Sequence, residues 1–466
     1  MTRRQIAALF VLCMAVFMVA IDNTVISVAV PSITEELRPD YNQILWISDI
    51  YSFVLAGLLV TMGNIGDRWG RKRLLLTAAL AFGAASAAAA MAPTAGLLIA
   101  ARAIQGVAGA GLMPPTLALL RTVFTDARQR SRAVGIWSAS GAAGAALGPT
   151  MAGVLLEHFY WGSVLLVNLP VVAVILGVGA WVLPEARSRS DHPMDPLSVV
   201  YSTAGILGVV YGVTELAHSG LGFWPAYPAL VIGAVLLVVF LRRQRLMPVP
   251  LLDIALFQEA KFSAAIFAQL LTVFANVGAL FFIPIYLRQA GGFSSLQAGM
   301  ALLPDSIVGM VAAPLVGRLI RNRGHRQVLL AGLGIGALGL ALLGLAIGVS
   351  YLAIVVPLMM VGLSFALVNT GANDLVLTSA SEDRVGAATG IAETSFELGN
   401  ALGIALVGSL VSVIYLIVTG DHGDLSASVD SRGFTIAMTG TALICAALMA
   451  ATTFGVARAL RTPAAS

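Results

Sequence analysis

The sequence predicts an all-α integral membrane protein with fourteen membrane-spanning helices. Of its 466 residues, 58% are hydrophobic and 11% are charged, and the mean hydropathy is +0.91. Soluble globular domains have about 25% charged residues. A spanning helix needs about 20 apolar residues, and fourteen such runs follow one another along the chain. Their approximate centres are Phe17, Leu55, Ala84, Gly109, Ala145, Ile175, Leu207, Ala234, Val273, Val308, Leu338, Leu363, Leu402 and Ala447.

The positive charges predict how these helices thread the membrane. When alternate loops are assigned to opposite sides, nearly all of the 27 Lys and Arg residues fall on the side that holds both termini. Arg38, Arg288 and Arg432 fall on the other side, and Arg102 lies inside a helix. This asymmetry follows the positive-inside rule, so both termini are expected in the cytoplasm and the helix count is expected to be even.

The N-terminal run and the two cysteines need no processing or cross-linking to explain them. The first apolar run is too long for a signal peptide and no small-residue cleavage pattern follows it, so we expect an uncleaved first helix. Cys13 and Cys445 lie inside the first and last runs. That placement suggests neither a disulfide framework nor a metal site.

Two glycine patterns recur at a nearly constant offset, which predicts an internal duplication. The turn after the second helix, residues 63–73, has a second copy at residues 317–326, after the tenth helix. The fifth and thirteenth helices share a further pattern, formed by Gly135, Gly144 and Gly148 and by Gly390, Gly399 and Gly403. Such duplication is typical of transporters built from two six-helix halves.

The offset is longer than six helices, so two helices are expected to be inserted between the halves. The expected domains are an N-terminal six-helix bundle (residues 1–183), an insert with its polar connectors (residues 184–260) and a C-terminal six-helix bundle (residues 261–466). A pseudo-twofold axis along the membrane normal should relate the two bundles, with the seventh and eighth helices outside that symmetry.

The turn that contains Gly63, Asp67, Arg68, Gly70 and Arg71 has two interpretations. Its basic residues hold the topology, and glycine permits a tight reversal. An acid adds nothing to a topology signal, so Asp67 favours a gating loop. Its carboxylate would bind backbone N–H groups at a neighbouring helix N-terminus, or a nearby Arg, in one conformation and release them in the other. The second copy has a basic residue in place of the acid, so the full latch is expected in the first half.

The fifth helix combines Gly135, Gly144, Gly148, Pro149 and Gly153. Glycines four residues apart form a small face on which another helix approaches closely, and proline is expected to bend the helix. Simple tight packing explains the glycines as well as any transport role does.

Five acids lie within the predicted membrane spans, where each costs about 2.5–3.5 kcal/mol. They are Asp22, Asp49, Asp305, Glu393 and Glu397. Only one basic residue, Arg102, lies at comparable depth, and its guanidinium is expected to reach an acid or carbonyl of the first or second helix. The acids are therefore predicted to line a central cavity that binds substrate and protons.

Four stretches resemble the motifs of one known family. Residues 63–72 resemble the loop motif of the major facilitator superfamily, and residues 102–106 resemble its helix-4 motif. Residues 135–153 resemble the antiporter motif of helix 5, with Ala152 where the family usually has glycine. Residues 22–31 resemble the helix-1 signature of the fourteen-helix branch. Over essentially its whole length the chain is thus similar to the fourteen-helix drug:proton antiporters of that superfamily, and more narrowly to bacterial quaternary ammonium and multidrug efflux pumps.

This resemblance implies the major facilitator fold, a gating role for the loop and a proton-relay role for Arg102. The expected function is export of hydrophobic, cationic drugs, antiseptics or dyes in exchange for protons. Glu393 and Glu397 lie four residues apart and share one helix face. Two carboxylates held close in a low-dielectric site do not both ionise easily, so an arriving cation should displace a proton.

Other functions remain open or are disfavoured. The chain carries no phosphate-binding loop and no soluble stretch long enough for an ATPase domain, and it shows no zinc, haem or nucleophile constellation. We expect no enzyme activity, no metal or other cofactor and no nucleic-acid partner, but a monomer in the bacterial cytoplasmic (inner) membrane. The alternatives are export or uptake of an endogenous metabolite, lipid or natural product, and a transport-inactive membrane sensor.

Overall fold

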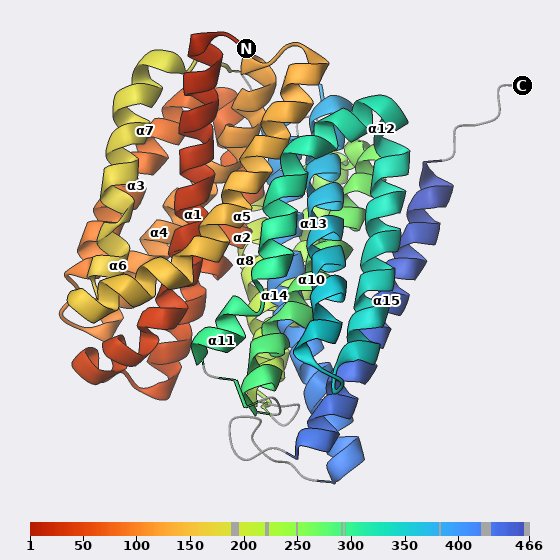
Figure 1. The fold of residues 1–466 in the computed structure, drawn as a ribbon. Helices are drawn as coiled ribbons and strands as arrows, with labels where there is room; N and C mark the ends of the chain where they lie inside the picture. Colours follow the sequence, from red (N-terminus) through yellow and green to blue (C-terminus); the bar gives the residue numbers. More distant parts are fainter. Residues whose placement is uncertain are drawn as a thin grey trace, which may run out of the picture. The chain divides into compact units, whose positions relative to one another are not determined.

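The computed structural model describes residues 1–187, 195–219, 223–247, 250–289, 292–293, 295–381, 384–420 and 430–460, and these residues form helices joined by short connections (Figure 1). The helices are α1 (Arg3–Leu37), α2 (Tyr41–Trp69), α3 (Arg71–Ala90), α4 (Ala95–Val123), α5 (Ala127–His158), α6 (Ser163–Leu166), α7 (Asn168–Val182), α8 (Pro196–Ser219), α9 (Ala226–Leu246), the 3-10 helix η1 (Ile254–Gln258), α10 (Ala260–Gln289), α11 (Ser295–Met300), α12 (Leu303–Ala346), α13 (Tyr351–Ser379), α14 (Val385–Thr419) and α15 (Ser431–Ala459).

Every predicted apolar run forms a helix. Within the described residues, 13 helices are long and apolar enough to cross a membrane. One of them, α12, contains two of the predicted helices. They meet at Gly324, where the backbone angles are not helical (φ 78°, ψ 159°). Residues 303–323 and 325–346 are each about long enough to span a bilayer. The all-α prediction is confirmed, and the expected turn after the tenth run lies at Gly324.

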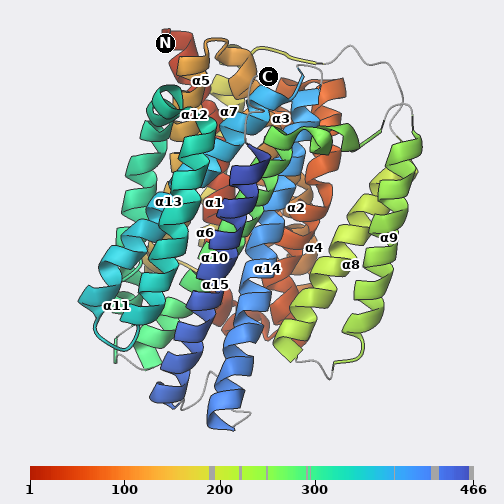
Figure 2. The same ribbon diagram turned by 90° about the vertical axis from the view of Figure 1, so that its right-hand side faces the viewer.

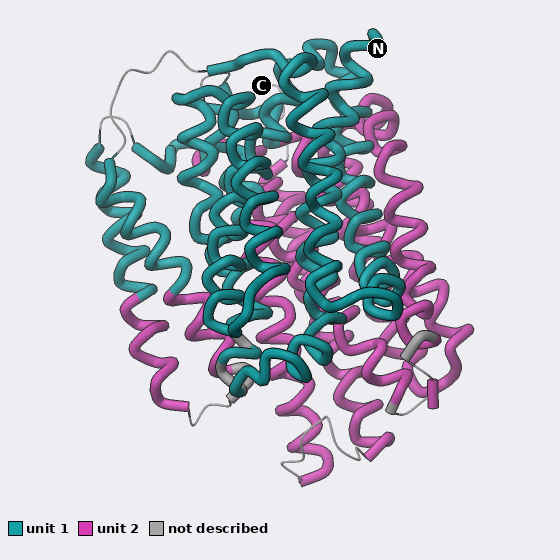
Figure 3. The backbone as a smooth tube through the Cα atoms, turned by 90° about the vertical axis from the view of Figure 1, so that its left-hand side faces the viewer, with its two compact units in different colours: residues 1–207, 233–256, 376–394 teal, residues 208–232, 257–375, 395–466 magenta. Residues whose placement is uncertain are grey.

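Residue contacts divide the chain into two compact units (Figure 3). The first comprises residues 1–207, 233–256 and 376–394, and the second comprises residues 208–232, 257–375 and 395–466. The first unit thus includes the end of α13 and the start of α14. The three-part domain division expected from the repeats follows sequence similarity rather than contacts, and it stays a prediction.

In the first unit, the N-terminal helices pack at close range through glycine. Helix α1 packs against α5, and α4 packs against both α2 and α3. A Cβ atom added at Gly144 of α5 would lie 2.6 Å from the backbone oxygen of Phe17 on α1. One added at Gly148 would overlap the hydroxyl of Thr24. Only glycine lets α1 and α5 approach this closely.

The second unit uses the same device at the repeated positions. A Cβ atom added at Gly399 or Gly403 of α14 would lie 2.7 Å from the oxygen of Leu270 or 2.6 Å from that of Phe274, both on α10. Gly144 and Gly148 on α5 and Gly399 and Gly403 on α14 therefore have the same packing role: each pair brings its helix against the first helix of its half, α1 or α10.

The inserted helices α8 and α9 run side by side (Figure 2). In the first unit, Gly205 of α8 faces Leu237 and the backbone of Gly233 on α9. The Thr203 hydroxyl of α8 donates a hydrogen bond to the oxygen of Gly57 on α2 (3.2 Å). This half of the inserted pair is thus packed on α2, the helix that ends in the predicted gating loop.

Replacing Gly144 with alanine is expected to lower the free energy of unfolding by about 1–3 kcal/mol, because the added methyl group meets a backbone carbonyl that no side-chain rotation can move. Gly153→Ala is the control, since a Cβ there meets nothing within 4 Å. Thermal unfolding of the detergent-purified variants measures the difference. Equal midpoints for the two variants would contradict the close packing of α1 on α5.

Candidate functional site

The predicted gating loop forms a tight reversal between α2 and α3. Gly70 occupies it with φ 117° and ψ 128°, backbone angles that residues with a Cβ rarely adopt. The carboxylate of Glu185 lies directly over Gly70, so that a Cβ there would come 2.5 Å from Oε1. Both backbone and space therefore require glycine. Arg68 lies partly buried beside this turn.

Asp67 is 4% exposed, and its carboxylate has two kinds of partner. Nε and Nη2 of Arg71 donate to Oδ1 at 3.0 and 2.8 Å. The backbone N–H groups of Gly386 and Ala387 donate to Oδ1 at 3.0 Å and to Oδ2 at 3.1 Å. These amides belong to the first turn of α14, whose N–H groups have no partners within the helix. Asp67 thus binds both of its expected partners, a helix N-terminus and an Arg, at the same time.

Close backbone contacts surround this ion pair. A Cβ atom at Gly63 would overlap the oxygen of Gly386, and one at Gly390 would lie 2.7 Å from the oxygen of Leu59. The Arg121 guanidinium of α4 donates to the oxygen of Leu377 (2.6 Å) at the end of α13. Residues 376–394 are therefore held against α2 and α4 by contacts that have no room for larger side chains.

The second copy of the loop is built differently. Gly324 is again in a positive-φ conformation (φ 78°), but Arg321 stands at the position of the acid and is exposed. His325, which follows the glycine, contacts Oδ2 of Asp374 on α13 through Nε2 (2.8 Å). The prediction that the second copy has no acid latch agrees with this geometry, whereas the His325 contact was not foreseen from the sequence.

Arg102 lies in a closed polar network inside the first unit. It is 0% exposed, as is Asp22, and its Nη1 lies 2.5 Å from Oδ2 of Asp22. Nε2 of Gln105 and Nδ2 of Asn168 donate to Oδ1 of Asp22 at 3.1 and 2.7 Å. The ring of Tyr51 lies 4.6 Å from the guanidinium carbon. The expectation that Arg102 reaches helix 1 is confirmed.

This network makes the surroundings of Asp22 different from those of the other predicted substrate and proton ligands. Asp22 is bound by three side chains and already has its counter-charge, whereas Asp49 on α2 is partly exposed. A buried carboxylate neutralised by Arg and amide donors is held in place by them. The structure therefore places Asp22 in a closed ion pair rather than at an open cavity surface.

The remaining three acids lie on α12 and α14. Asp305 is partly exposed, and within the described ranges no donor reaches its buried Oδ1. Glu393 and Glu397 are 3% and 8% exposed and occupy successive turns of the continuous helix α14. The unit boundary passes between them, with Glu393 in the first unit and Glu397 in the second. Asn400, on the next turn, forms a hydrogen bond with the Glu397 side chain.

The second unit contains a row of buried amide side chains that the sequence analysis did not predict. Gln269 and Asn276 on α10 are each 1% exposed, as is Asn373 on α13. Nε2 of Gln269 donates to Oδ1 of Asn369 (3.0 Å). Positions 269, 272 and 276 are polar within an apolar helix and share one face. This helical periodicity is the signal that would have identified the row.

The antiporter-motif residues divide by location. Gly135, Gly144 and Gly148 are buried, while Pro149 and Gly153 are exposed. Helix α5 continues through Pro149 to His158. Gly144 and Gly148 thus carry the packing on α1, and Pro149 and Gly153 lie on an exposed face of α5.

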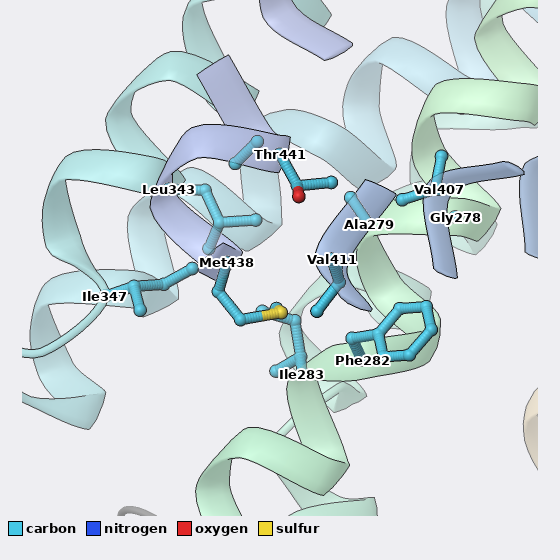
Figure 4. Close-up of a pocket in the computed structure, with 11 residues that line it drawn as sticks. Gly278, Ala279, Phe282, Ile283, Leu343, Ile347, Val407, Val411, Met438 and Thr441 are labelled. Carbon is cyan, nitrogen blue, oxygen red and sulfur yellow. The ribbon is translucent and has the colours of Figure 1, made fainter. Parts of the chain in front are cut away.

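A crevice in the second unit is apolar (Figure 4). Its side chains come from α10, α12, α14 and α15, and include Phe282, Leu343, Val411 and Met438, with Thr441 as the polar exception. None of the described residues that line it is titratable. Among the described residues, no group of three His, Cys, Asp or Glu side chains is placed to hold a metal ion.

Asp22→Asn is expected to destabilise the protein by about 3–5 kcal/mol, because it leaves the buried Arg102 guanidinium without a counter-charge. Removing both charges in Asp22→Asn/Arg102→Gln should cost less than the sum of the two single changes. Thermal unfolding midpoints of the three variants in detergent form the test. Strict additivity would mean that the two side chains do not stabilise each other.

Comparison with known proteins agrees with this architecture. The sequence matches the Major Facilitator Superfamily over residues 12–404. It is 41% identical to the multidrug efflux pump LfrA of Mycolicibacterium smegmatis over 88% of this chain and 82% of that protein. It is 35% identical to the methyl viologen resistance protein SmvA of Salmonella typhimurium over 88% and 83% of the two chains. The crystal structure of the human organic anion transporter MFSD10 superposes on 96% of this chain and 100% of that one with a TM-score of 0.68, at 15% identity. The chain is therefore a multi-pass membrane protein of the Major Facilitator Superfamily, a transporter rather than an enzyme.

Proposed function

We propose that this protein exports hydrophobic, cationic small molecules across a bacterial cytoplasmic membrane, as a monomer, in exchange for protons. The relatives support export: LfrA is a multidrug efflux pump, and SmvA is a methyl viologen resistance protein. Methyl viologen is an organic dication. A binding site for such compounds needs carboxylates that are not already neutralised by Arg or Lys.

The observation that carries the proposal is the distribution of charge among the buried acids. Arg102 is committed to Asp22 at 2.5 Å. Glu397 is buried with an amide, Asn400, as its hydrogen-bond partner, and the buried oxygen of Asp305 receives no donor from the described residues. A carboxyl group in this environment is neutral with a proton or charged beside an organic cation.

Competition between a proton and a substrate cation for these carboxyls is sufficient for exchange, provided that access alternates. Protons enter from the more acidic outside, and a cation arriving from the cytoplasm favours the charged carboxylate and expels them. Glu393 and Glu397 share one face of α14, so charge on one side chain opposes charge on the other.

Asp67 supplies the gate in this scheme. With Arg71 and the first turn of α14 as its partners, its carboxylate closes the cytoplasmic end in one conformation and releases α14 in the other. Negative charge at a helix N-terminus is stabilised by the exposed N–H groups and the helix dipole.

Export of an endogenous metabolite or natural product is the second candidate. The tetracenomycin C resistance and export protein of Streptomyces glaucescens, 29% identical over 87% of this chain, favours it. Everted membrane vesicles with an imposed pH gradient distinguish the two functions when challenged with cationic, neutral and anionic dyes. Uptake confined to the cations supports the first candidate, and indifference to the whole panel supports the second.

Asp67→Asn is expected to abolish transport while insertion and substrate binding stay within about twofold of wild type, because the neutral amide loses its ion pair with Arg71. Arg321→Asn, at the equivalent exposed position of the second copy, is the matched control and should transport at the wild-type rate. Dye efflux from proteoliposomes gives the rates. Wild-type transport by Asp67→Asn would leave the loop with a topological role alone.

Adding methyl viologen to weakly buffered, detergent-solubilised wild type should release protons into solution. The Glu393→Gln/Glu397→Gln double variant should release fewer or none and should lose gradient-driven efflux, because the exchangeable protons have been removed. A sensitive pH electrode or dye records the change. Wild-type proton release by the double variant would move coupling elsewhere, with Asp22 and Asp49 as the next candidates.

A further inference from the structure

The two connectors of the inserted helix pair both contact the gating loop. The first connector (residues 183–187) precedes α8, and the second connector (residues 250–253) follows α9. All of their contacts with the loop lie within the first unit. The proposed gate is thus bordered by the two segments that lead into and out of the inserted helix pair.

The second connector is tied to α2 through Asn64. Nδ2 of Asn64 donates to the backbone oxygen of Leu251 (2.7 Å) and to that of Val60 (2.9 Å). Asn64 is 8% exposed and lies one helical turn before Asp67. The hydrogen bond to Leu251 therefore fixes the turn of α2 that carries the gating carboxylate.

The same connector is tied to the inserted pair through Gln244. This side chain at the end of α9 is 2% exposed. Its Oε1 accepts the N–H groups of Leu251 (2.6 Å) and Leu252 (3.1 Å), and its Nε2 donates to the hydroxyl of Ser198 on α8 (2.7 Å). One amide thus joins α8, α9 and the second connector.

An ion pair closes the end of the inserted pair. Nε of Arg243 lies 2.7 Å from Oδ2 of Asp195, and the Ser198 hydroxyl donates to the same oxygen (2.6 Å). The hydrogen bonds from Arg243 and Ser198 lower the pKa of the Asp195 carboxyl, so the acid is ionised at neutral pH. The two helix ends are held together where the connector leaves them.

The second connector also reaches the other side of the gate. Asp253 forms an ion pair with Arg384, which lies two residues before Gly386, the first amide bound by Asp67. The connector therefore contacts α2 through Asn64 and the start of α14 through Arg384, the two segments that Asp67 joins.

The first connector holds the α3 side of the loop. The N–H of Arg71 donates to the oxygen of Ala186 (2.9 Å), and the N–H of Lys72 donates to Oε1 of Glu185 (3.3 Å). They are the first two residues after Gly70. Each connector of the inserted pair is therefore hydrogen-bonded to a residue next to the gate.

We propose that the inserted helix pair positions the gate: Asn64, Gln244 and Asp253 are positioning residues that hold Asp67 in register with the N-terminus of α14. This inference rests on the proposed gating function of Asp67. Since these side chains lie at the gate and not among the buried acids, they set the rate at which the transporter cycles and not the affinity for substrate.

The first test measures the geometry of the gate without any substrate. Hydrogen–deuterium exchange of purified protein is followed in peptides that cover residues 384–390. Asn64→Ala and Asp253→Ala should raise exchange there at least fivefold, as should Asp67→Asn. Glu259→Ala, which removes an exposed acid just beyond the second connector, is the matched control and should leave exchange unchanged. Wild-type exchange in both connector variants would overturn the proposal.

The second test measures ethidium efflux from proteoliposomes, normalised to inserted protein. Asn64→Ala and Asp253→Ala should lower kcat at least fivefold with KM within twofold of wild type. Asp253→Arg should be equally slow, and Asp253→Arg/Arg384→Asp should recover at least half of the wild-type kcat, because the reversed ion pair restores the link. Failure of the double variant to recover, or a parallel rise in KM, would refute positioning.

The two proposals fail in different ways. Wild-type transport by Asp67→Asn would refute the gating role of Asp67 and, with it, the proposed role of the connectors in turnover. Loss of transport in Asp67→Asn together with wild-type kcat and exchange in the connector variants would keep the gate and refute the connector role alone.

Discussion

The structure of the proposed gate depends on one carboxylate. Asp67 is almost fully buried, and a buried charge persists only where cations and N–H donors replace the water it has lost. Arg71 supplies the cation and the first turn of α14 supplies the amides. The close backbone contacts at Gly63 and Gly386 follow from this requirement, since the amides can reach the carboxylate only where α2 and α14 nearly touch. The packing is thus a consequence of the charge.

The same requirement explains why buried acids have unequal roles. Asp22 is bound by Arg102, Gln105 and Asn168, so its charge is compensated within this network. Glu397 has an amide partner and lacks this compensation among the described residues. In the proposed exchange of cations for protons, a pair such as Asp22 and Arg102 stabilises the fold, and a carboxyl such as Glu397 binds the ions that move.

Much of this architecture could be predicted from the sequence. Run length and composition gave the helices, and the glycine offset gave the repeated packing of α5 and α14, because helix periodicity and small-residue contacts are local. The reach of Arg102 to the first or second helix was also expected, since Asp22 and Asp49 lie at its depth, and the structure pairs it with Asp22. The connector network could not be foreseen: Asn64, Gln244 and Asp253 lie in three separate segments, and only the folded chain brings them to one loop. The His325 contact with Asp374 was hidden for the same reason.

The glycine contacts also constrain how the protein can evolve. At Gly144, Gly399 and Gly403 the obstructing atom is a backbone oxygen, which no substitution in the facing helix can remove. Gly148 differs, because its neighbour is the Thr24 side chain, which a second change could shorten. At three of these four positions, replacement of the glycine therefore cannot be compensated by a second substitution in the facing helix. Selection for a new range of exported compounds must act on the side chains around these helix crossings and leave the crossings themselves unchanged.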